Sequence, residues 1–179
     1  MIELEWINNE IFIAQEPVVF LGNEEIEFLK QQAIQSMRRR ARICAHQTNE
    51  DALHEMLIAI TSDSYIHPHK HVDKSESFHI VEGLVDVVIF DDSGVIENVI
   101  ALGPQGSGRS FYYRLSDSRF HTLIIHSDVL VIHEVTNGPF DKTQTKFALF
   151  APSENDDEAA CGYMERLSKE AADFTRSMK

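Results

Sequence analysis

The chain has 179 residues and a mass of 20.4 kDa, the size of one domain with appendages. Its 16 basic and 29 acidic side chains give a formal net charge of −13, which argues against a nucleic-acid partner because phosphates would be repelled. No apolar run reaches the roughly 18–20 residues that cross a bilayer, so no membrane partner is expected. The acidic N-terminus and the presence of only two cysteines predict a cytoplasmic protein.

The N-terminal part is expected to combine short strands with helices. Residues 11–13 and 18–20 are apolar and predict strands at a sheet edge or in an arm that reaches another subunit. Asn23 can cap a helix in which apolar residues recur at helical spacing as far as Met37. The three arginines at 38–40 then end this helix, where cations favour the carbonyl end.

A second helix is predicted shortly afterwards. Thr48 offers an N-cap, and apolar residues follow at positions 53, 56, 57 and 60, which is the spacing of one helical face. His54 lies off this stripe and is expected at the surface. The helix would pack one face against the rest of the domain.

The stretch from Ser64 to Gly83 carries the strongest chemical signal in the chain. His67, His69 and His71 alternate, so a β-strand would place all three side chains on one face. Glu76 follows a short polar turn, after which the chain can swing back toward the same point. Imidazoles and a carboxylate that meet in this way form a metal-site geometry.

Residues 83–152 predict an all-β structure. Gly83 to Phe90 and Val95 to Leu102 form a predicted hairpin around an Asp-Asp-Ser-Gly turn. Further short strands are predicted at about 109–115, 119–126, 128–136 and 145–150. Short strands at this spacing indicate a barrel or jelly roll.

The alternation of side chains along these strands makes a further prediction. If Glu76 and His121 point into the barrel, the apolar residues two and four positions further along each strand do so as well. His79 and His126 would then face away from the interior.

After Pro152 the composition changes. The acidic residues at 153–158 predict a solvated linker, and the segment from Ala159 predicts an amphipathic helix that docks on the barrel or on another subunit. The expected organisation is one structural domain with N-terminal strands and helices at 1–62, a barrel at 63–152, and a linker and C-terminal helix at 153–179.

The histidine-rich stretch resembles a known family. His69-x-His71, followed by Glu76 and then Gly83, is similar to the first motif of the cupins. Cupins place a second-motif histidine on the same ion, and His121 is the best candidate. The resemblance implies a cupin-type double-stranded β-helix, a jelly-roll barrel, with two N-terminal helices and a C-terminal helix. It also implies a metal site made of His69, His71, Glu76 and His121.

A broader set of motifs resembles the WbuC-type cupin-fold metalloproteins. The segments that carry this resemblance are 64–71, Glu82-Gly83, 90–94, Phe120-His121, 134–140 and 151–154. Two positions depart from the expected pattern, because Cys44 stands in place of an asparagine and His67 in place of an arginine. The family is associated with surface-polysaccharide gene clusters, which implies a sugar or sugar nucleotide as substrate.

Other polar residues are candidates for the ligand pocket. Arg40, His46 and Tyr65 could steady an anionic group, and His67 shares the face of the two metal-ligating histidines. Glu134 could move a proton as a catalytic residue if it lies in the pocket.

The ligand set leaves the metal and the function open. Three imidazoles and a carboxylate suit one divalent transition-metal ion, which could be nickel, zinc, iron, manganese, cobalt or copper. The first hypothesis is a metal-dependent enzyme that acts on a small polar molecule. The alternatives are an iron-dependent dioxygenase and a non-catalytic module that binds a small ligand. A homodimer is expected, because the N-terminal strands could pair at sheet edges.

Overall fold

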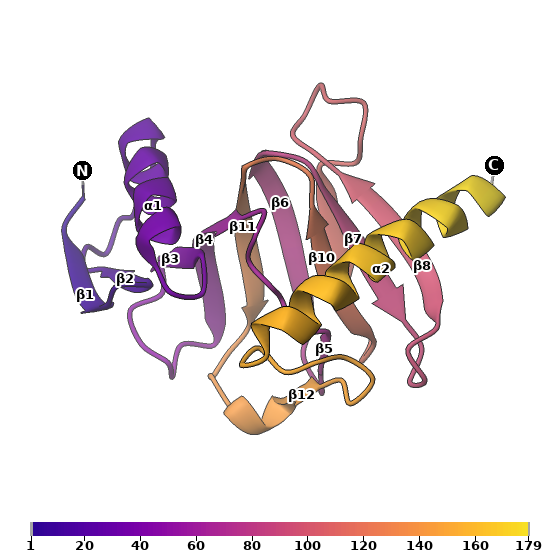
Figure 1. Cartoon of the computed structure of the whole chain (residues 1–179). Coiled ribbons are helices and arrows are strands. Elements are labelled where there is room, and N and C mark those ends of the chain that lie inside the picture. Colours follow the sequence, from indigo (N-terminus) through magenta and orange to yellow (C-terminus); the bar gives the residue numbers. More distant parts are fainter. Residues whose placement is uncertain (1, 179) are drawn as a thin grey trace.

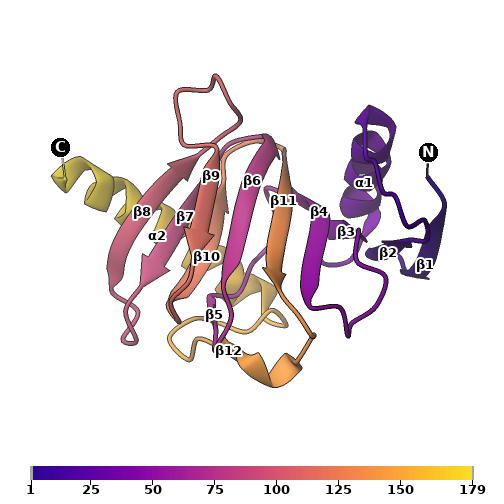
Figure 2. The same cartoon turned by 180° about the vertical axis from the view of Figure 1, so that it is seen from behind.

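The computed structural model describes residues 2–178 and consists of two β-sheets with one helix packed on the outside of each (Figures 1 and 2). The larger sheet has the strand order β1 (Leu4–Asn8), β2 (Ile11–Ala14), β3 (Arg40–Cys44), β4 (Leu53–Thr61), β11 (Val129–Asn137), β6 (Glu76–Glu82) and β9 (Tyr112–Leu115). The smaller sheet has the order β12 (Thr145–Phe147), β5 (His69–His71), β10 (Phe120–Ile125), β7 (Val85–Phe90) and β8 (Ile96–Leu102). This arrangement confirms the predicted all-β jelly roll.

The main core lies between the two sheets. Side chains that alternate along each strand fill it, as the pleat of a strand requires. The buried members are Ile60, Phe78, Ile80, Val85, Val87, Ile89, Leu102, Tyr113, Leu123, Leu130 and Ile132. Phe78, Ile80 and Leu123 are therefore interior, while His79 is exposed, and the predicted alternation around Glu76 and His121 is confirmed.

Each helix covers the outer face of one sheet. Helix α1 (Asn23–Gln35) packs Leu29 and Ala33 against Ala41, Ile43 and Leu57 of β3 and β4, in a second buried cluster. Helix α2 (Asp157–Ser177) crosses the five-stranded sheet, as Figure 1 shows, and covers a third cluster. The buried residues of this third cluster are Val88, Phe90, Phe120, Ile124, Ala148, Leu167 and Ala171. The C-terminal helix docks on the barrel, as predicted.

The second N-terminal helix was a wrong prediction, because residues 53–61 form strand β4. Met56 and Ile58 face the barrel interior, while Leu57 and Ala59 pack toward α1. A strand that is buried on both faces has a nearly continuous apolar run, which also matches a helical stripe. His54 on this strand is only 4% exposed, so the prediction of a surface position is also wrong.

The bounds of the other N-terminal elements differ from the prediction as well. The N-cap of α1 is Gly22 rather than Asn23, and the helix ends at Gln35, where the Ser36 N–H donates to the Gln32 carbonyl. Arg40 does not end the helix but begins β3, and Ser36 Oγ donates to the Arg40 carbonyl at 2.9 Å. Residues 18–20 form no strand.

The C-terminal helix begins earlier than predicted. Asp156 caps α2, and its side chain accepts a hydrogen bond from the Ala159 N–H at 3.1 Å. Part of the acidic stretch is thus ordered by helix capping, where a carboxylate also favours the positive end of the helix dipole. Within residues 2–178 no helix is both long and apolar enough to span a membrane.

We expect the α2 contact to contribute strongly to stability. Leu167 of α2 is 2% exposed, so Leu167→Ala should lower the free energy of unfolding by about 2–4 kcal/mol through lost burial and a residual cavity. Lys169→Ala, on the exposed face of the same helix, serves as the control and should cost less than about 0.5 kcal/mol. Denaturant unfolding followed by circular dichroism measures both, and equal midpoints for the two variants would contradict the docking.

Candidate metal centre

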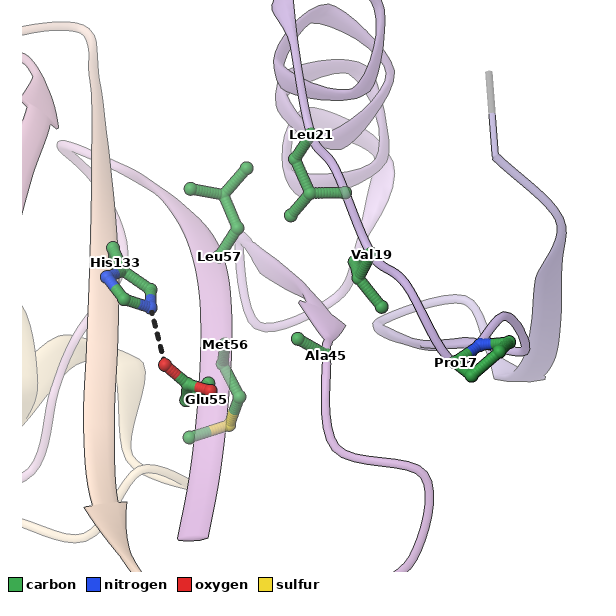
Figure 3. A pocket seen from close by; sticks show the side chains of 8 residues that line it. All are labelled: Pro17, Val19, Leu21, Ala45, Glu55, Met56, Leu57 and His133. Carbon is green, nitrogen blue, oxygen red and sulfur yellow. Dashed lines mark ion pairs between the residues drawn. The ribbon is translucent and has the colours of Figure 1, made fainter.

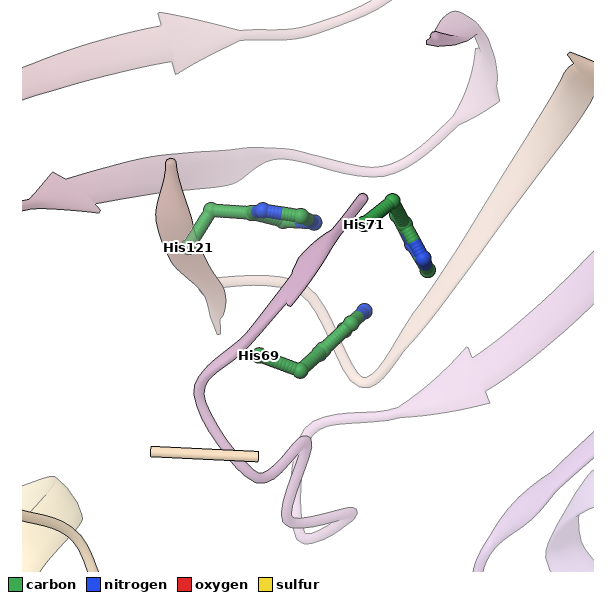
Figure 4. Close-up of side chains that lie close together, drawn as sticks. All are labelled: His69, His71 and His121. Carbon is green, nitrogen blue, oxygen red and sulfur yellow. The ribbon is translucent and has the colours of Figure 1, made fainter. Parts of the chain in front are cut away.

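Three histidines from two adjacent strands converge at one end of the barrel. His69 and His71 lie on β5, and His121 lies on β10 directly opposite His69 in the antiparallel register. One ring nitrogen from each of the three residues lies within 4.8 Å of the other two, so this group could hold a metal ion. Figure 4 shows the three rings reaching into the same space from their two strands. The two-residue spacing of His69 and His71 puts both on one face of β5.

Hydrogen bonds fix the orientation of these rings. His69 Nδ1 donates to the His67 carbonyl at 2.9 Å, and His121 Nδ1 donates to the Arg119 carbonyl at 3.0 Å. His71 Nδ1 lies 3.3 Å from Thr145 Oγ1. Because a carbonyl can only accept, Nδ1 of His69 and of His121 carries a proton, and Nε2 of each ring points away from these carbonyl partners. Metal-ligating histidines are oriented in this way by partners behind the ring.

Glu76 lies on β6 of the larger sheet and contacts two of the three histidines of the smaller sheet. Its carboxylate is 4% exposed, with Oε1 2.7 Å from His121 Nε2 and Oε2 3.2 Å from His71 Nε2. Nevertheless, neither Glu76 Oε1 nor His121 Nε2 has a hydrogen bond of acceptable geometry to any described residue. An imidazole nitrogen and a carboxylate oxygen this close together inside a protein need a proton or a metal ion between them. Two donors bound at right angles to one ion, each about 2.1 Å from it, lie about 3 Å apart, which matches these spacings.

The electrostatics of the four residues agree with a cation site. Desolvation, with the neighbouring His121, lowers the pKa of His69 to about 3, so its imidazole is neutral at physiological pH. Although burial alone would raise it, His121 and His71 hold the pKa of Glu76 well below its usual range. Glu76 in turn raises the pKa of His121 against the effect of burial. Either a proton or a metal ion can therefore occupy the position between Glu76 and His121.

Glu134 lies on the inner face of the large sheet, beyond Glu76. It stands between Met56 on β4 and Phe78 on β6 in the strand register. Burial, and then the charge of Glu76, raise the pKa of Glu134 to about 7, while Arg42 acts in the opposite direction. A carboxyl group with this pKa can exchange a proton near neutral pH. The side chain is partly exposed on the inner face of the sheet, and its predicted catalytic role stays a prediction.

Three of the residues predicted to bind substrate instead link the barrel to the segment before α2. Arg40 Nη2 pairs with Glu154 Oε1 at 2.9 Å, and Tyr65 Oη donates to the Pro152 carbonyl at 2.9 Å. His67 Nε2 lies 2.9 Å from the Ala148 carbonyl. These side chains are not members of the histidine group, and their predicted role in ligand binding stays a prediction.

His46 packs against His54, a buried residue of β4. Its ring stacks on that of His54, with centroids 4.0 Å apart, and its Nδ1 accepts a hydrogen bond from the Glu55 N–H at 3.2 Å. The strand register aligns His54, Thr136 and Glu76 in one row across β4, β11 and β6. His46 is thus connected by stacking to the row that contains Glu76.

Arg42 is an interior residue that the sequence interpretation missed. It pairs with Ile58 in the register of β3 and β4, on the face opposite to Ala41 and Ile43, which pack toward α1. The sequence does carry a signal for this position, because Arg40, Arg42 and Cys44 are spaced two residues apart, as residues on one face of a strand are. The assignment of the arginines to a helix end concealed this pattern.

A separate hollow lies on the outer face of β4 and β11. Figure 3 shows Glu55, Leu57 and His133 on its walls, together with the segment from Pro17 to Leu21. His133 Nε2 and Glu55 Oε1 form an ion pair there at 3.7 Å. These strand residues alternate with those that face the barrel interior, so the hollow is not part of the histidine site.

Comparisons with known proteins agree with this architecture. The family model of a domain of unknown function, DUF6016, matches residues 21–102. No curated protein matches the chain. Protein SO0799 from Shewanella oneidensis is structurally similar, with a TM-score of 0.53 and 8% identity over 72% of this chain and 85% of that chain.

Weaker structural similarity extends to proteins that are described as cupins or oxalate decarboxylases. A cupin superfamily protein from Desulfitobacterium hafniense has a TM-score of 0.42 and 12% identity, over 55% of this chain and 76% of that chain. A mutant of oxalate decarboxylase from Bacillus subtilis has a TM-score of 0.44 and 15% identity, over 54% of this chain and 24% of that chain. The jelly-roll fold is assigned from the strand topology of the chain itself.

The environment of Glu134 predicts an unusual dependence of stability on pH. Its pKa is about 7 in the folded protein, against a reference value of 4.5, so the folded state binds the proton more tightly than the unfolded state. Its contribution to the free energy of unfolding is therefore present below about pH 4.5 and is lost as the pH rises toward 7.

The Glu134→Gln variant tests this directly, because the amide cannot ionise. After treatment with EDTA, wild-type protein should lose more stability than Glu134→Gln between pH 5 and pH 7.5 in denaturant unfolding. Glu165→Gln on the exposed surface of α2 is the control and should keep the wild-type slope. Parallel slopes for wild type and Glu134→Gln would show that Glu134 titrates normally.

Proposed function

We propose that this protein is a metal-dependent cupin that holds one divalent transition-metal ion and presents it to a small polar ligand. The proposed ligands of the ion are His69, His71, Glu76 and His121. One observation carries the proposal: three imidazoles converge, and two of them, those of His71 and His121, contact the buried carboxylate of Glu76, whose Oε1 has no hydrogen-bond partner among the described residues. The sequence resemblance to the WbuC-type cupins supports a sugar or sugar nucleotide as the ligand class.

The chemistry of the donors limits the choice of ion. Imidazole disfavours calcium and magnesium, which prefer oxygen ligands, and it suits nickel, zinc, iron, manganese, cobalt and copper. When bound, a divalent ion would polarise a carbonyl group or acidify a bound water. Three neutral imidazoles and one carboxylate leave the centre with a net charge near +1, which favours ligands with oxygen donors or negative charge.

The surrounding residues supply the rest of the site. Phe78 and Leu123 follow Glu76 and His121 by two residues on β6 and β10 and belong to the apolar core between the sheets. His67 and Arg119 hold the rings of His69 and His121 through their carbonyl oxygens. Glu134, on the inner face of the same barrel, would hold or release a proton at its carboxyl group. These roles are those of an enzyme site that binds, orients and exchanges protons.

Removal of a central ligand should abolish metal binding. We expect His71→Ala to reduce the metal content from about one ion per chain to near zero, because the remaining donors bind an ion far more weakly. His79→Ala, on the outward face of β6, should keep the wild-type content. Elemental analysis of the purified proteins measures both, with circular dichroism as a check of folding. A full complement of metal in His71→Ala would remove that residue from the ligand set.

Thr145, which lies behind the His71 ring, should increase the affinity for the metal ion without being essential for binding. Thr145→Val keeps the shape of the side chain but removes the hydroxyl that lies 3.3 Å from His71 Nδ1. Loss of such a partner typically weakens metal binding about 10–100-fold. We expect a shift of at least tenfold in a competition titration with a chelator, and Thr143→Val, with its side chain bonded to Asp141, is the matched control. An unchanged affinity in Thr145→Val would show that Thr145 does not orient the ring.

A further inference from the structure

The exposure of side chains around the histidine group rises toward one edge of the smaller sheet. The side chain of His121 on β10 is 2% exposed, and that of His71 on β5 is 22% exposed. Strand β12 comes next in the strand order and forms the edge of this sheet. Its residue Phe147 is 56% exposed. Solvent, and therefore a ligand, reaches the histidines most readily from the side of β12.

Both inward-facing side chains of β12 lie against a histidine of the group. The antiparallel register pairs Phe147 with His69, and His69 in turn with His121. Paired residues point to the same face of a sheet, and the ring centroids of Phe147 and His69 are 6.2 Å apart. Thr145 pairs with His71, and its Oγ1 lies 3.3 Å from His71 Nδ1. Only one imidazole ring therefore separates Phe147 from the space in which the three histidines converge.

The Phe147 ring is held in place although the residue is mostly exposed. Its centroid lies 5.1 Å from that of the His67 ring, at an interplanar angle of 31°. His67 is itself fixed, because its Nε2 lies 2.9 Å from the Ala148 carbonyl and the Tyr65 ring lies nearly parallel to it at 6.0 Å. A side chain that is already fixed in this way loses little conformational freedom when a ligand covers it.

Exposure alone does not distinguish Phe147 from other apolar residues of this segment. Leu149, two residues later, is fully exposed as well. It lies beyond the end of β12, however, and the register of the described strands pairs it with no histidine. The combination of exposure with a position beside His69 is what indicates that Phe147 contacts a ligand.

We propose that Phe147 is a stacking platform for the ring of a sugar whose oxygen atoms bind the metal ion. The inference rests on the proposed function, because the ion would hold the oxygens of the sugar while Phe147 covers one face of its ring. The face of a phenyl ring carries partial negative charge. The C–H groups of a sugar are made partially positive by the neighbouring oxygens, so they are attracted to that face. Because a phenyl ring forms no conventional hydrogen bonds, Phe147 would select for a ring with an apolar face rather than for individual hydroxyl groups.

A sugar ring fits this position better than a nucleobase. Phe147 is one imidazole ring away from the histidine group, so the group that stacks on it must lie close to the oxygen atoms that bind the ion. In a sugar these oxygens are attached to the stacked ring itself. In a sugar nucleotide a diphosphate separates the base from the sugar, which places the base too far from the ion.

Two matched ligands test the assignment on metal-loaded protein. Methyl glucuronide and methoxyacetate both have a carboxylate next to an ether oxygen, a pair that can chelate an ion, but only methyl glucuronide has a sugar ring. Titration calorimetry should show methyl glucuronide binding at least about fivefold more tightly, a gain typical of one aromatic contact. Phe147→Leu keeps an apolar side chain without a π face and should reduce this preference to within about twofold. Phe147→Tyr, which restores an aromatic ring, and Leu149→Ala, the exposed control, should both keep it.

The outcomes separate this inference from the proposed function. All four proteins should contain the same amount of metal. No preference for methyl glucuronide in the wild type, or a preference that survives in Phe147→Leu, would overturn the stacking role and leave the metal site standing. Loss of metal from Phe147→Leu would likewise overturn it, because the residue would then support His69 rather than the ligand. Wild-type protein that retains no metal after loading would contradict the proposed function itself, on which the inference rests.

Two other occupants of the Phe147 ring would also overturn the proposal. Uridine that binds more tightly than methyl glucuronide, and does so only when position 147 is aromatic, would show that the ring stacks on a base. A wild-type dimer that dissociates in Phe147→Leu, measured by analytical ultracentrifugation at equal concentrations, would show that a second copy of the chain covers the ring. We expect no binding of uridine and the same oligomeric state in both proteins.

Discussion

The contact between Glu76 and His121 is the constraint on which the site depends. The two side chains are buried, and their facing atoms are 2.7 Å apart without a hydrogen bond of acceptable geometry. The Arg119 carbonyl fixes the His121 proton on Nδ1, so the Nε2 lone pair is directed at a carboxylate oxygen. Only a positive charge between them makes this arrangement favourable. His69 and His71 direct their rings toward the same place, which makes a metal ion the fitting cation.

The barrel brings these residues together by packing its two sheets face to face. Glu76 lies on β6 of the large sheet, and the histidines lie on β5 and β10 of the small one. Alternation along each strand then places apolar side chains deeper in the barrel and leaves polar ones at its end. Helix α2 supports β10 from outside through Phe120 and Ile124, which flank the inward-facing residues of that strand. The helix therefore stabilises strand β10, which carries His121.

Much of the fold and of the site could be predicted from the sequence, because strand alternation is a local signal. His69 and His71 are two residues apart, and Glu76 follows a tight turn, so their meeting required only a short strand and a reversal. Strand β4 could not be recognised, since a strand buried on both faces and a helix share an apolar pattern at this length. The assignment of residues 38–40 to the end of the first helix likewise left β3, and with it the position of Arg42, unrecognised. Contacts such as that between Arg40 and Glu154 join residues far apart in the chain, and no local pattern indicates them.

X-ray absorption spectroscopy of the metal-loaded protein tests the central claim most directly. The arrangement of donors predicts a first shell of nitrogen and oxygen atoms at about 2.0–2.2 Å, with the outer-shell scattering of three imidazole rings. Loss of one imidazole contribution in His121→Ala would tie that signal to β10. A first shell dominated by sulfur at about 2.3 Å, or one without imidazole scattering, would contradict a centre built from His69, His71 and His121.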